Sequence, residues 1–291
     1  MEATGASSTD VVAELRALVP AGLELHYTIP AEAKAAGVMA CEFGPDEETL
    51  AWLRELPTQR RSGFKTFLQR TLREYMSDFD ANALLDMYPM FLLGERQLGR
   101  LLGLSQGARM GSVLDVGAGS GDVTRRLRPW CDRLLTTERS WGMARHLRRA
   151  GFECLRIDLS ETTAGLTDAP YDLISCFNVL DRCPRPGSLL KAIRGLLAPN
   201  GRLLLSVPLP FEPMFYSGAR TLDPLEALDV AGAEWAEAAQ DLCARVLPQN
   251  GFRPTTLSRV PYLSGGDSRR AAYVLDTAVV VAEVERDAEP G

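Results

Sequence analysis

The second half of the chain alternates short apolar runs with segments of helical period. The strand-like runs occupy residues 112–119, 133–138, 153–159, 171–180 and 202–210. The helix-like segments occupy residues 122–130, 141–151 and 188–201. Strands that alternate with helices of this length indicate βαβ units and a parallel sheet that helices cover on both faces.

The last part of the core has a different pattern. Residues 252–263 and 271–284 are two extended segments, and the loop SGGDSRR joins them with no helix between. The pattern therefore predicts an antiparallel hairpin at one edge of the sheet.

Before residue 105 the pattern is helical, but prolines interrupt it. Five apolar residues recur with a helical period and would share one helix face: Phe64, Phe67, Leu68, Leu72 and Tyr75. Residues 10–18 and 47–56 are weaker helix candidates. We therefore expect four parts, namely a flexible tail (1–10), an N-terminal helical cap (11–104) packed on the core, the core itself (105–283) and a second tail (284–291).

The composition argues against several classes of function. A net charge of −6 argues against a general nucleic-acid binder, which usually has a basic surface. Six cysteines without a Cys-x-x-Cys pair, and two histidines, do not predict a metal site. The chain begins with no secretory signal and has no membrane-spanning apolar run. We expect an intracellular protein, in the cytoplasm or associated with endomembrane or mitochondrial compartments, and no membrane insertion.

A glycine-rich turn, VLDVGAGSGDV, follows the first strand of the core. Its glycines allow the backbone to approach a ligand, and the next helix offers free N–H groups. A dinucleotide fingerprint needs Gly-x-Gly-x-x-Gly, but Asp122 stands where the third glycine would be. A phosphate-binding loop is also missing, so a phosphate-bearing cofactor is not favoured.

The turn instead resembles motif I of the class I S-adenosylmethionine-dependent methyltransferases, D/E-x-G-x-G-x-G. S-adenosyl-L-methionine carries a sulfonium and an ammonium but no phosphate, so an acidic Asp115 suits it. The resemblance implies that Asp115, Gly117, Ala118 and Gly119 bind this cofactor, whose product is S-adenosyl-L-homocysteine. The implied fold is α/β, a Rossmann-like, seven-stranded and mostly parallel sheet with the antiparallel C-terminal hairpin and the N-terminal helical cap.

Two further carboxylates end successive strands. Glu138 ends the second strand and is placed to accept both ribose hydroxyls, as an acidic residue does in dinucleotide folds. Asp158 closes the third strand and is placed to accept from the adenine amino group. Each alone is equally consistent with a surface carboxylate, but three at the ligand-binding edge of one sheet favour a cofactor site.

The segment after the fourth strand, FNVLDRCPRP, bears on the acceptor. Amino-methylating DNA and glutamine enzymes have an [N/D]-P-P-[Y/F] motif there, and its absence argues against that branch. Cys176 and Cys183 suggest a nucleophilic cysteine, but no acid or base is spaced to activate them. Buried structural thiols are the favoured interpretation.

Seven segments resemble, in order, the DREV-type methyltransferase-like family, from about Met90 to Val281. They are LDVGAGSGDVT, TTERS, YDLISCFNVLDRCPRPGSLLKAIRGLL, VPLPFEP, LPQNGF, RVPYL and YVLDTAVVV. The resemblance implies protein-histidine methylation at the pros (π) nitrogen in His-x-His motifs with a small middle residue. It also implies protein or peptide partners that contain His-x-His, and we expect a monomer.

The resemblance also implies site residues. Asp181 would accept the N–H of the acceptor imidazole, or else cap the next segment or pair with Arg182. Asn178 would bind the methionine part of the cofactor or the imidazole. Tyr262 would shield the cofactor and Tyr273 would hydrogen-bond near the acceptor ring, unless both are ordinary core aromatics.

Three aromatic residues follow the fifth strand and would form either a peptide wall or a capped loop: Phe211, Phe215 and Tyr216. His26 and His146 are far apart and form no His-x-His, so self-methylation at such a motif is not available. Two other functions stay open. One is methylation of a small molecule such as a quinone or an acid, and the other is a non-catalytic cofactor-binding scaffold, which would be expected to have lost glycines or carboxylates that are intact here.

Overall fold

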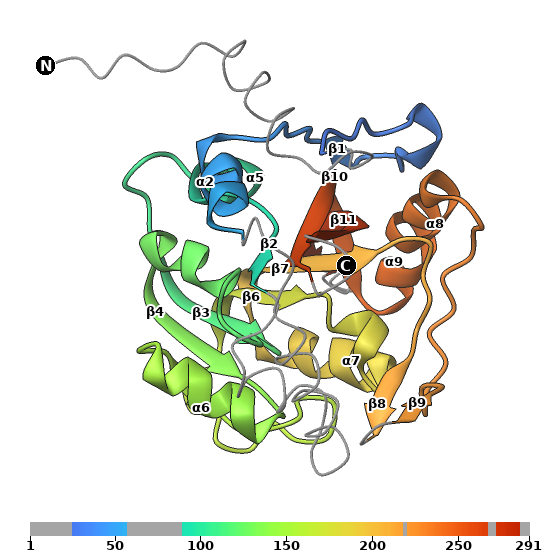
Figure 1. The fold of residues 1–291 in the computed structure, drawn as a ribbon. Coiled ribbons are helices and arrows are strands. Elements are labelled where there is room, and N and C mark those ends of the chain that lie inside the picture. The colour runs from blue at the N-terminus through green and yellow to red at the C-terminus, as the bar shows by residue number, and fades with distance from the viewer. Residues whose placement is uncertain (1–24, 57–88, 218–219, 267–271, 286–291) are drawn as a thin grey trace, which may run out of the picture.

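The computed structural model describes residues 25–56, 89–217, 220–266 and 272–285 (Figure 1). The helices predicted at residues 10–18 and 64–75 lie outside these ranges. Within them, the fold is a large twisted sheet with helices on both faces.

The main sheet has nine strands in the order β1-β10-β11-β7-β6-β3-β4-β5, and β2 also pairs with β10. The strands are β1 (Met39–Ala40), β2 (Met90–Phe91), β3 (Met110–Val116), β4 (Cys131–Thr137), β5 (Glu153–Leu155), β6 (Tyr171–Phe177), β7 (Leu197–Pro208), β10 (Phe252–Gly265) and β11 (Ala272–Val284). Strands β3 to β7 are mutually parallel, whereas β11 is antiparallel to both neighbours, β7 and β10. The sheet from β5 to β10 is the predicted seven-stranded, Rossmann-like methyltransferase sheet, so the predicted fold class is confirmed.

The inner strands are buried along most of their length because both of their faces are covered. In β6, Leu173 and Phe177 pack into one core, and Ile174 and Cys176 pack into the other. The first core lies under α5 (Glu95–Leu101) and the 3-10 helix η2 (Thr124–Trp130). Helix α6 (Trp141–Arg149) adds a small cluster beside it.

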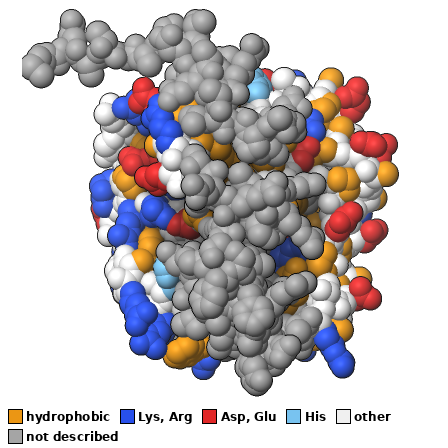
Figure 2. Space-filling model, viewed as in Figure 1, with side chains coloured by type: hydrophobic (Ala, Val, Ile, Leu, Met, Phe, Trp, Pro, Cys, Tyr) orange, Lys and Arg blue, Asp and Glu red, His pale blue; other side chains and the backbone are white. Residues whose placement is uncertain are grey.

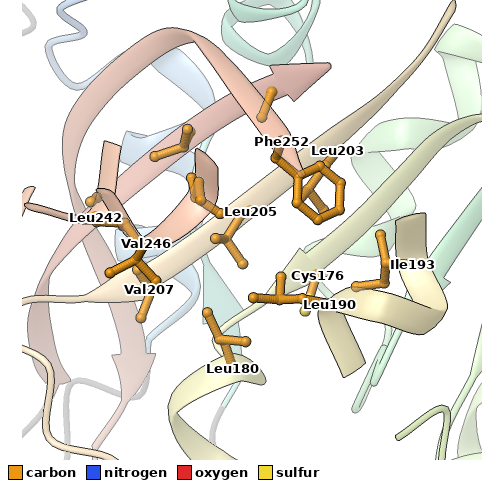
Figure 3. Packing of buried hydrophobic residues seen from close by; sticks show 14 of the residues in the cluster. Cys176, Leu180, Leu190, Ile193, Leu203, Leu205, Val207, Leu242, Val246 and Phe252 are labelled. Atoms are coloured by element: carbon orange, nitrogen blue, oxygen red, sulfur yellow. The ribbon is translucent and has the colours of Figure 1, made fainter. Parts of the chain in front are cut away.

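The second core is the larger one and is shown in Figure 3. Leu190 and Ile193 of α7 (Pro186–Leu196) pack on Leu203 and Leu205 of β7. Three consecutive helical segments cover the rest of this face, namely α8 (Trp235–Asp241), the π-helix η4 (Leu242–Val246) and α9 (Leu247–Gln249). The alternating pattern had not indicated these segments.

Several element boundaries differ from the predicted ones. The helix predicted at 122–130 is the 3-10 run η2, which contains Pro129, a residue that lacks the N–H an α-helix would use. The helix predicted at 188–201 ends at Leu196, because Leu197 already pairs with Tyr171 of β6. The third strand ends at Leu155 and not at residue 159.

The described part of the predicted helical cap is not purely helical. It contains α2 (Glu47–Glu55), which begins with a capping box between Asp46 and Thr49, and a short 3-10 helix η1 (Ala31–Ala33). It also contributes two strands to the sheet, since β1 and β2 both pair with β10. The edge at which the hairpin was expected to end the sheet is therefore covered by residues that precede the core.

Among the residues described, no helix is long and apolar enough to cross a membrane.

Candidate cofactor and acceptor site

The glycine turn follows β3 at the carboxyl edge of the parallel strands. Gly117 and Gly119 have φ of +66° and +56°, a region that favours residues without a Cβ. A Cβ on Gly117 would stand 2.6 Å from Cγ2 of Val179. The missing side chain therefore lets the turn pack directly against the segment that follows β6. The amide of Ala118 donates to the carbonyl of Thr137 at 3.1 Å and ties the turn to β4.

Asp115 is buried beneath the turn, with only 1% of its surface exposed. The hydroxyl of Thr124 donates to its Oδ2 at 2.5 Å, and the hydroxyl of Ser175 donates to its Oδ1 at 2.6 Å. Burial raises the pKa of Asp115 to about 6 against these two hydrogen bonds, and the charge of Glu138 adds to the rise. This carboxylate holds β3, η2 and β6 together below the turn.

Glu138 follows β4 and faces the glycine turn. Its Oε2 accepts from the amide of Gly119 at 3.0 Å, and its Oε1 accepts from the amide of Ser140 at 2.8 Å. Burial raises the pKa of Glu138, and these backbone hydrogen bonds oppose the rise. Each carboxylate oxygen keeps further lone-pair capacity, so the group can still accept from two ribose hydroxyls.

Asp158 does not close a strand, as the sequence had suggested, because β5 ends three residues earlier, at Leu155. Its Oδ1 accepts from the amide and the hydroxyl of Ser160 at 3.0 and 2.6 Å. Its Oδ2 lies 3.7 Å from Nη1 of Arg139, next to Glu138. The structure thus brings Asp158 to the same edge as Glu138, although its oxygens already have protein partners.

Asn178 is the first residue after β6 and has a left-handed φ of +53°. The hydroxyl of Ser206 donates to its Oδ1 at 2.9 Å, and its amide donates to the carbonyl of Ser206 at 2.9 Å. These bonds to β7 hold a conformation that few residues other than glycine adopt. They place Asn178 at the carboxyl end of β6, level with the glycine turn.

Asp181 lies in the 3-10 helix η3 (Leu180–Arg182) and is 2% exposed. Its Oδ2 is 3.1 Å from Nε of Arg182, so the pairing considered from the sequence exists. Its Oδ1 is buried and has no hydrogen-bond partner in the described structure. Burial raises the pKa of Asp181, and the charge of Arg182 lowers it. A buried hydrogen-bond acceptor without a donor is uncommon in folded proteins, so this oxygen indicates a place where a ligand can donate a hydrogen bond.

The hairpin contributes the two tyrosines, which share one face of the β10–β11 pair. Tyr262 stands opposite Leu275, and Tyr273 stands opposite Ser264. Tyr262 is buried. Burial raises the pKa of its hydroxyl most, and the charges of Asp115 and Asp181 raise this pKa further. Tyr273 is half-buried nearer the hairpin tip.

The aromatic residues after β7 do not form one exposed wall. Phe211 is half-buried and packs against the larger core. Phe215 is buried at the start of the short strand β8 (Phe215–Ser217), which pairs with β9 (Arg220–Leu222) and packs on η3. The amide of Met214 donates to the carbonyl of Asp181 at 2.9 Å, so this segment fixes the backbone of η3.

The two cysteines near Asp181 are structural. Cys176 is fully buried and Cys183 is nearly so, and both are free thiols. Burial raises the pKa of Cys176 well above its usual value and that of Cys183 to about 12. Thiols of this kind are poor nucleophiles, and the predicted burial of both residues is confirmed.

Met90 and Asp122 belong to the site, and the sequence analysis had not assigned either of them. The hydroxyl of Tyr262 donates to Sδ of Met90 at 3.1 Å, and Cε of Met90 would be 3.8 Å from a Cβ on Gly119. The amide of Met90 donates to Oδ2 of Asp122 at 3.1 Å. For Asp122, the sequence did give a signal, because this aspartate stands where a dinucleotide site would have its third glycine. For Met90 it gave none, because the two-residue strand β2 is too short to show a periodic pattern.

These residues fit S-adenosyl-L-methionine. The positive φ values of Gly117 and Gly119 shape a tight turn, and Glu138 offers carboxylate oxygens beside it. The acidic groups in the turn suit a cation and would oppose a pyrophosphate. Asn178 and Asp181 follow the neighbouring strand β6 at the same carboxyl edge of the sheet.

Comparisons with known proteins match the chain to methyltransferases. A model of the DREV methyltransferase family matches residues 33–284. The ubiquinone biosynthesis O-methyltransferase of Xylella fastidiosa (strain 9a5c) is 31% identical over 99 residues, which are 32% of this chain and 40% of that protein. The probable ribosomal RNA small subunit methyltransferase A of Halobacterium salinarum (strain ATCC 29341 / DSM 671 / R1) is 32% identical over 99 residues, which are 29% and 35%. The chain spans less than half the length of these curated relatives.

Two solved structures are similar at low identity. The DhpI–SAH complex has a TM-score of 0.45 and 18% identity, and the match covers 77% of this chain and 98% of that chain. The N-methyltransferase NodS from Bradyrhizobium japonicum WM9, in complex with S-adenosyl-L-homocysteine, has a TM-score of 0.41 and 19% identity, with coverage of 66% and 86%.

Proposed function

The chain belongs to the DREV methyltransferase family and uses S-adenosyl-L-methionine as its cofactor, and we propose that it methylates protein histidine. The acceptor is the pros nitrogen of a histidine in a His-x-His motif whose middle residue is small. The observation that carries this proposal is the buried carboxylate of Asp181, which has one unpartnered oxygen at the acceptor side of the site.

A neutral imidazole suits this carboxylate. With a pKa near about 6.5 it already has a free lone pair at neutral pH, so no strong base is needed to activate it. It does have to be held in the correct tautomer and in line with the methyl group. Oδ1 of Asp181 accepts the N–H of the tele nitrogen, which leaves the pros nitrogen free to attack.

When bound, the cofactor would supply a sulfonium methyl group to the pros nitrogen, and sulfur would keep the electron pair of the carbon–sulfur bond that breaks. The ring becomes a cation, which Asp181 stabilises as the buried aspartate does in a serine-protease triad. The tele N–H proton then leaves to solvent, and Asn178 and Tyr262 border the reacting groups.

The test is a direct assay of transfer. The purified protein is incubated with S-adenosyl-L-methionine labelled in its methyl group and with the peptide Ala-His-Ala-His-Ala or its all-alanine counterpart. We expect label on the first peptide alone, in a residue that elutes as pros-methylhistidine after acid hydrolysis. Label at the tele nitrogen, or on neither peptide, would contradict the proposal.

Two controls separate the acceptor from the cofactor. Asp181→Asn keeps the size of the side chain but removes its charge, so we expect transfer to fall and the affinity for S-adenosyl-L-homocysteine to stay within about twofold. A peptide with leucine between the histidines tests the preference for a small middle residue and should be labelled poorly. Full activity of Asp181→Asn would refute the role of this carboxylate.

A small-molecule acceptor is the second candidate. It is favoured by the similarity to an enzyme named for ubiquinone biosynthesis. The same labelled cofactor, offered with a hydroquinone, distinguishes the two: label in the hydroquinone but not in the histidine peptide would support the second candidate.

A further inference from the structure

Arg182 makes a contact with its neighbour that local geometry does not provide. In a 3-10 helix, successive side chains point about 120° apart, so residues i and i+1 do not face each other. Nevertheless Nε of Arg182 lies 3.1 Å from Oδ2 of Asp181 within η3. The guanidinium has therefore folded back onto the preceding carboxylate.

This ion pair is poorly suited to a purely structural role. The carboxylate is almost fully buried, and the arginine side chain is 30% exposed. Oδ1 of Asp181 and Nη1 of Arg182 are both buried without a partner in the described structure. A buried pair contributes to stability only when its remaining hydrogen-bonding capacity is also satisfied, and here each member leaves an atom unused.

The backbone of both residues of the pair is hydrogen-bonded. The amide of Arg182 donates to the carbonyl of Val179 at 2.9 Å, and the amide of Met214 donates to the carbonyl of Asp181 at the same distance. Val179, which packs on Gly117, thus holds the backbone of Arg182. Met214, which precedes β8, holds the backbone of Asp181. With one oxygen engaged, the carboxylate plane is set, and the other oxygen has a fixed direction.

We infer that Arg182 is a positioning residue, which holds the Asp181 carboxylate by Oδ2 so that Oδ1 is presented to the N–H of the acceptor. The inference rests on the proposed function, because it assigns Arg182 to the step in which Asp181 orients the acceptor ring. Arg182 itself touches neither the cofactor nor the reacting nitrogen in this arrangement. A lysine, with a single charged nitrogen, replaces the charge but not the direction of the Nε–H bond.

The test is a double-mutant cycle of Arg182→Met and Asp181→Asn, with Arg182→Lys as the conservative variant. At saturating cofactor, we expect Arg182→Met to lower kcat for the histidine peptide by roughly 10²-fold, the scale of a misplaced reacting group. KM for the peptide and the affinity for S-adenosyl-L-homocysteine should change by less than threefold. Arg182→Lys should recover part of the lost kcat.

The decisive result is the fourth corner of the cycle. If Arg182 acts through Asp181, Arg182→Met adds little further loss once Asp181→Asn is present. A multiplicative loss in the double variant, or a loss confined to cofactor affinity, would overturn the inference. The double variant also lacks both charges, so it guards against a single variant that fails to fold because one buried charge has lost its partner.

A failure of the proposed function would be distinguishable. If the wild-type protein labels no histidine peptide, the acceptor assignment fails, and crystal structures of the wild type and Arg182→Met decide the inference separately. An Asp181 side chain that moves or becomes disordered in the variant supports the positioning role. An unchanged Asp181 rotamer in the variant would overturn it.

Discussion

The buried carboxylate of Asp115 should make the stability of the protein depend on pH in an unusual direction. Its pKa is raised from 3.8 to about 6, and burial is the largest cause. Between these two values the folded protein binds more protons than the unfolded chain. The free energy of unfolding should therefore fall as the pH rises through this window, and the loss should be complete above about pH 7.

The size of the effect follows from the shift. One pKa unit corresponds to about 1.4 kcal/mol, so a rise of roughly two units makes the ionised form cost about 3 kcal/mol in the folded state. Part of that cost is already present at pH 4.5, where the unfolded chain is mostly ionised. Between about pH 4.5 and about pH 7.5, the wild type should therefore lose about 2 kcal/mol relative to Asp115→Asn.

The measurement is urea unfolding of the wild type and Asp115→Asn, followed by circular dichroism at several pH values. The substitution changes the hydrogen bonds to Thr124 and Ser175, which adds an offset at every pH. The prediction concerns only how the difference between the two proteins changes with pH, so this offset does not affect it. A difference that stays constant from pH 4.5 to pH 7.5 would refute the argument.

Asp241 provides a matched control. Its pKa is lowered, chiefly by the hydrogen bond from Arg245, so the stabilisation it gives is present above the unfolded value of 3.8 and is lost as the pH falls below it. Asp241→Asn should therefore differ from the wild type by a nearly constant amount between pH 4.5 and pH 7.5. A slope in this control would show that other groups dominate the titration.

Three further predictions concern the cofactor side of the site. Gly117→Ala should weaken S-adenosyl-L-homocysteine binding at least tenfold in calorimetry because its Cβ would meet Val179, and Val179→Ala in the same protein should restore part of the affinity. Glu138→Gln should weaken that binding by about 1.5–3 kcal/mol, the value of a hydrogen bond to a charged group, and an unchanged affinity would exclude the ribose contact. Asp122→Ala should speed hydrogen exchange at the amide of Met90, whereas Asp122→Asn, which keeps an acceptor oxygen, should speed it less.

The sequence predicted the sheet well because its strands are buried on both faces. Strands β3, β4, β6 and β7 each contain consecutive apolar residues, and the glycines and prolines between them mark the turns. It predicted the elements before the core less well. β1 and β2 have two residues each, which is too short for any period, and both depend on pairing with the distant strand β10.

The site residues were predictable in kind but not in their contacts. Asp115 lies near the end of β3 and Glu138 follows β4, so their common edge of the sheet could be inferred before the structure. The pairing of Asp181 with Arg182 was among the possibilities that the sequence offered, but the contact with Met214 was not, because Met214 comes from beyond β7. The same holds for Met90, whose link to Asp122 joins residues that lie on separate elements.

The glycine turn and the segment that follows β6 pack against each other. Val179 fills the space that the missing Cβ of Gly117 leaves, and the carbonyl of Val179 accepts from the amide of Arg182. Val179 directly precedes η3, which contains Asp181. A side chain at position 117 that displaces Val179 should therefore also displace η3. It follows that a side chain at position 117 should disturb transfer as well as cofactor affinity, so that kcat at saturating cofactor falls in Gly117→Ala. A variant with weaker binding but full kcat would show instead that the two halves of the site act independently.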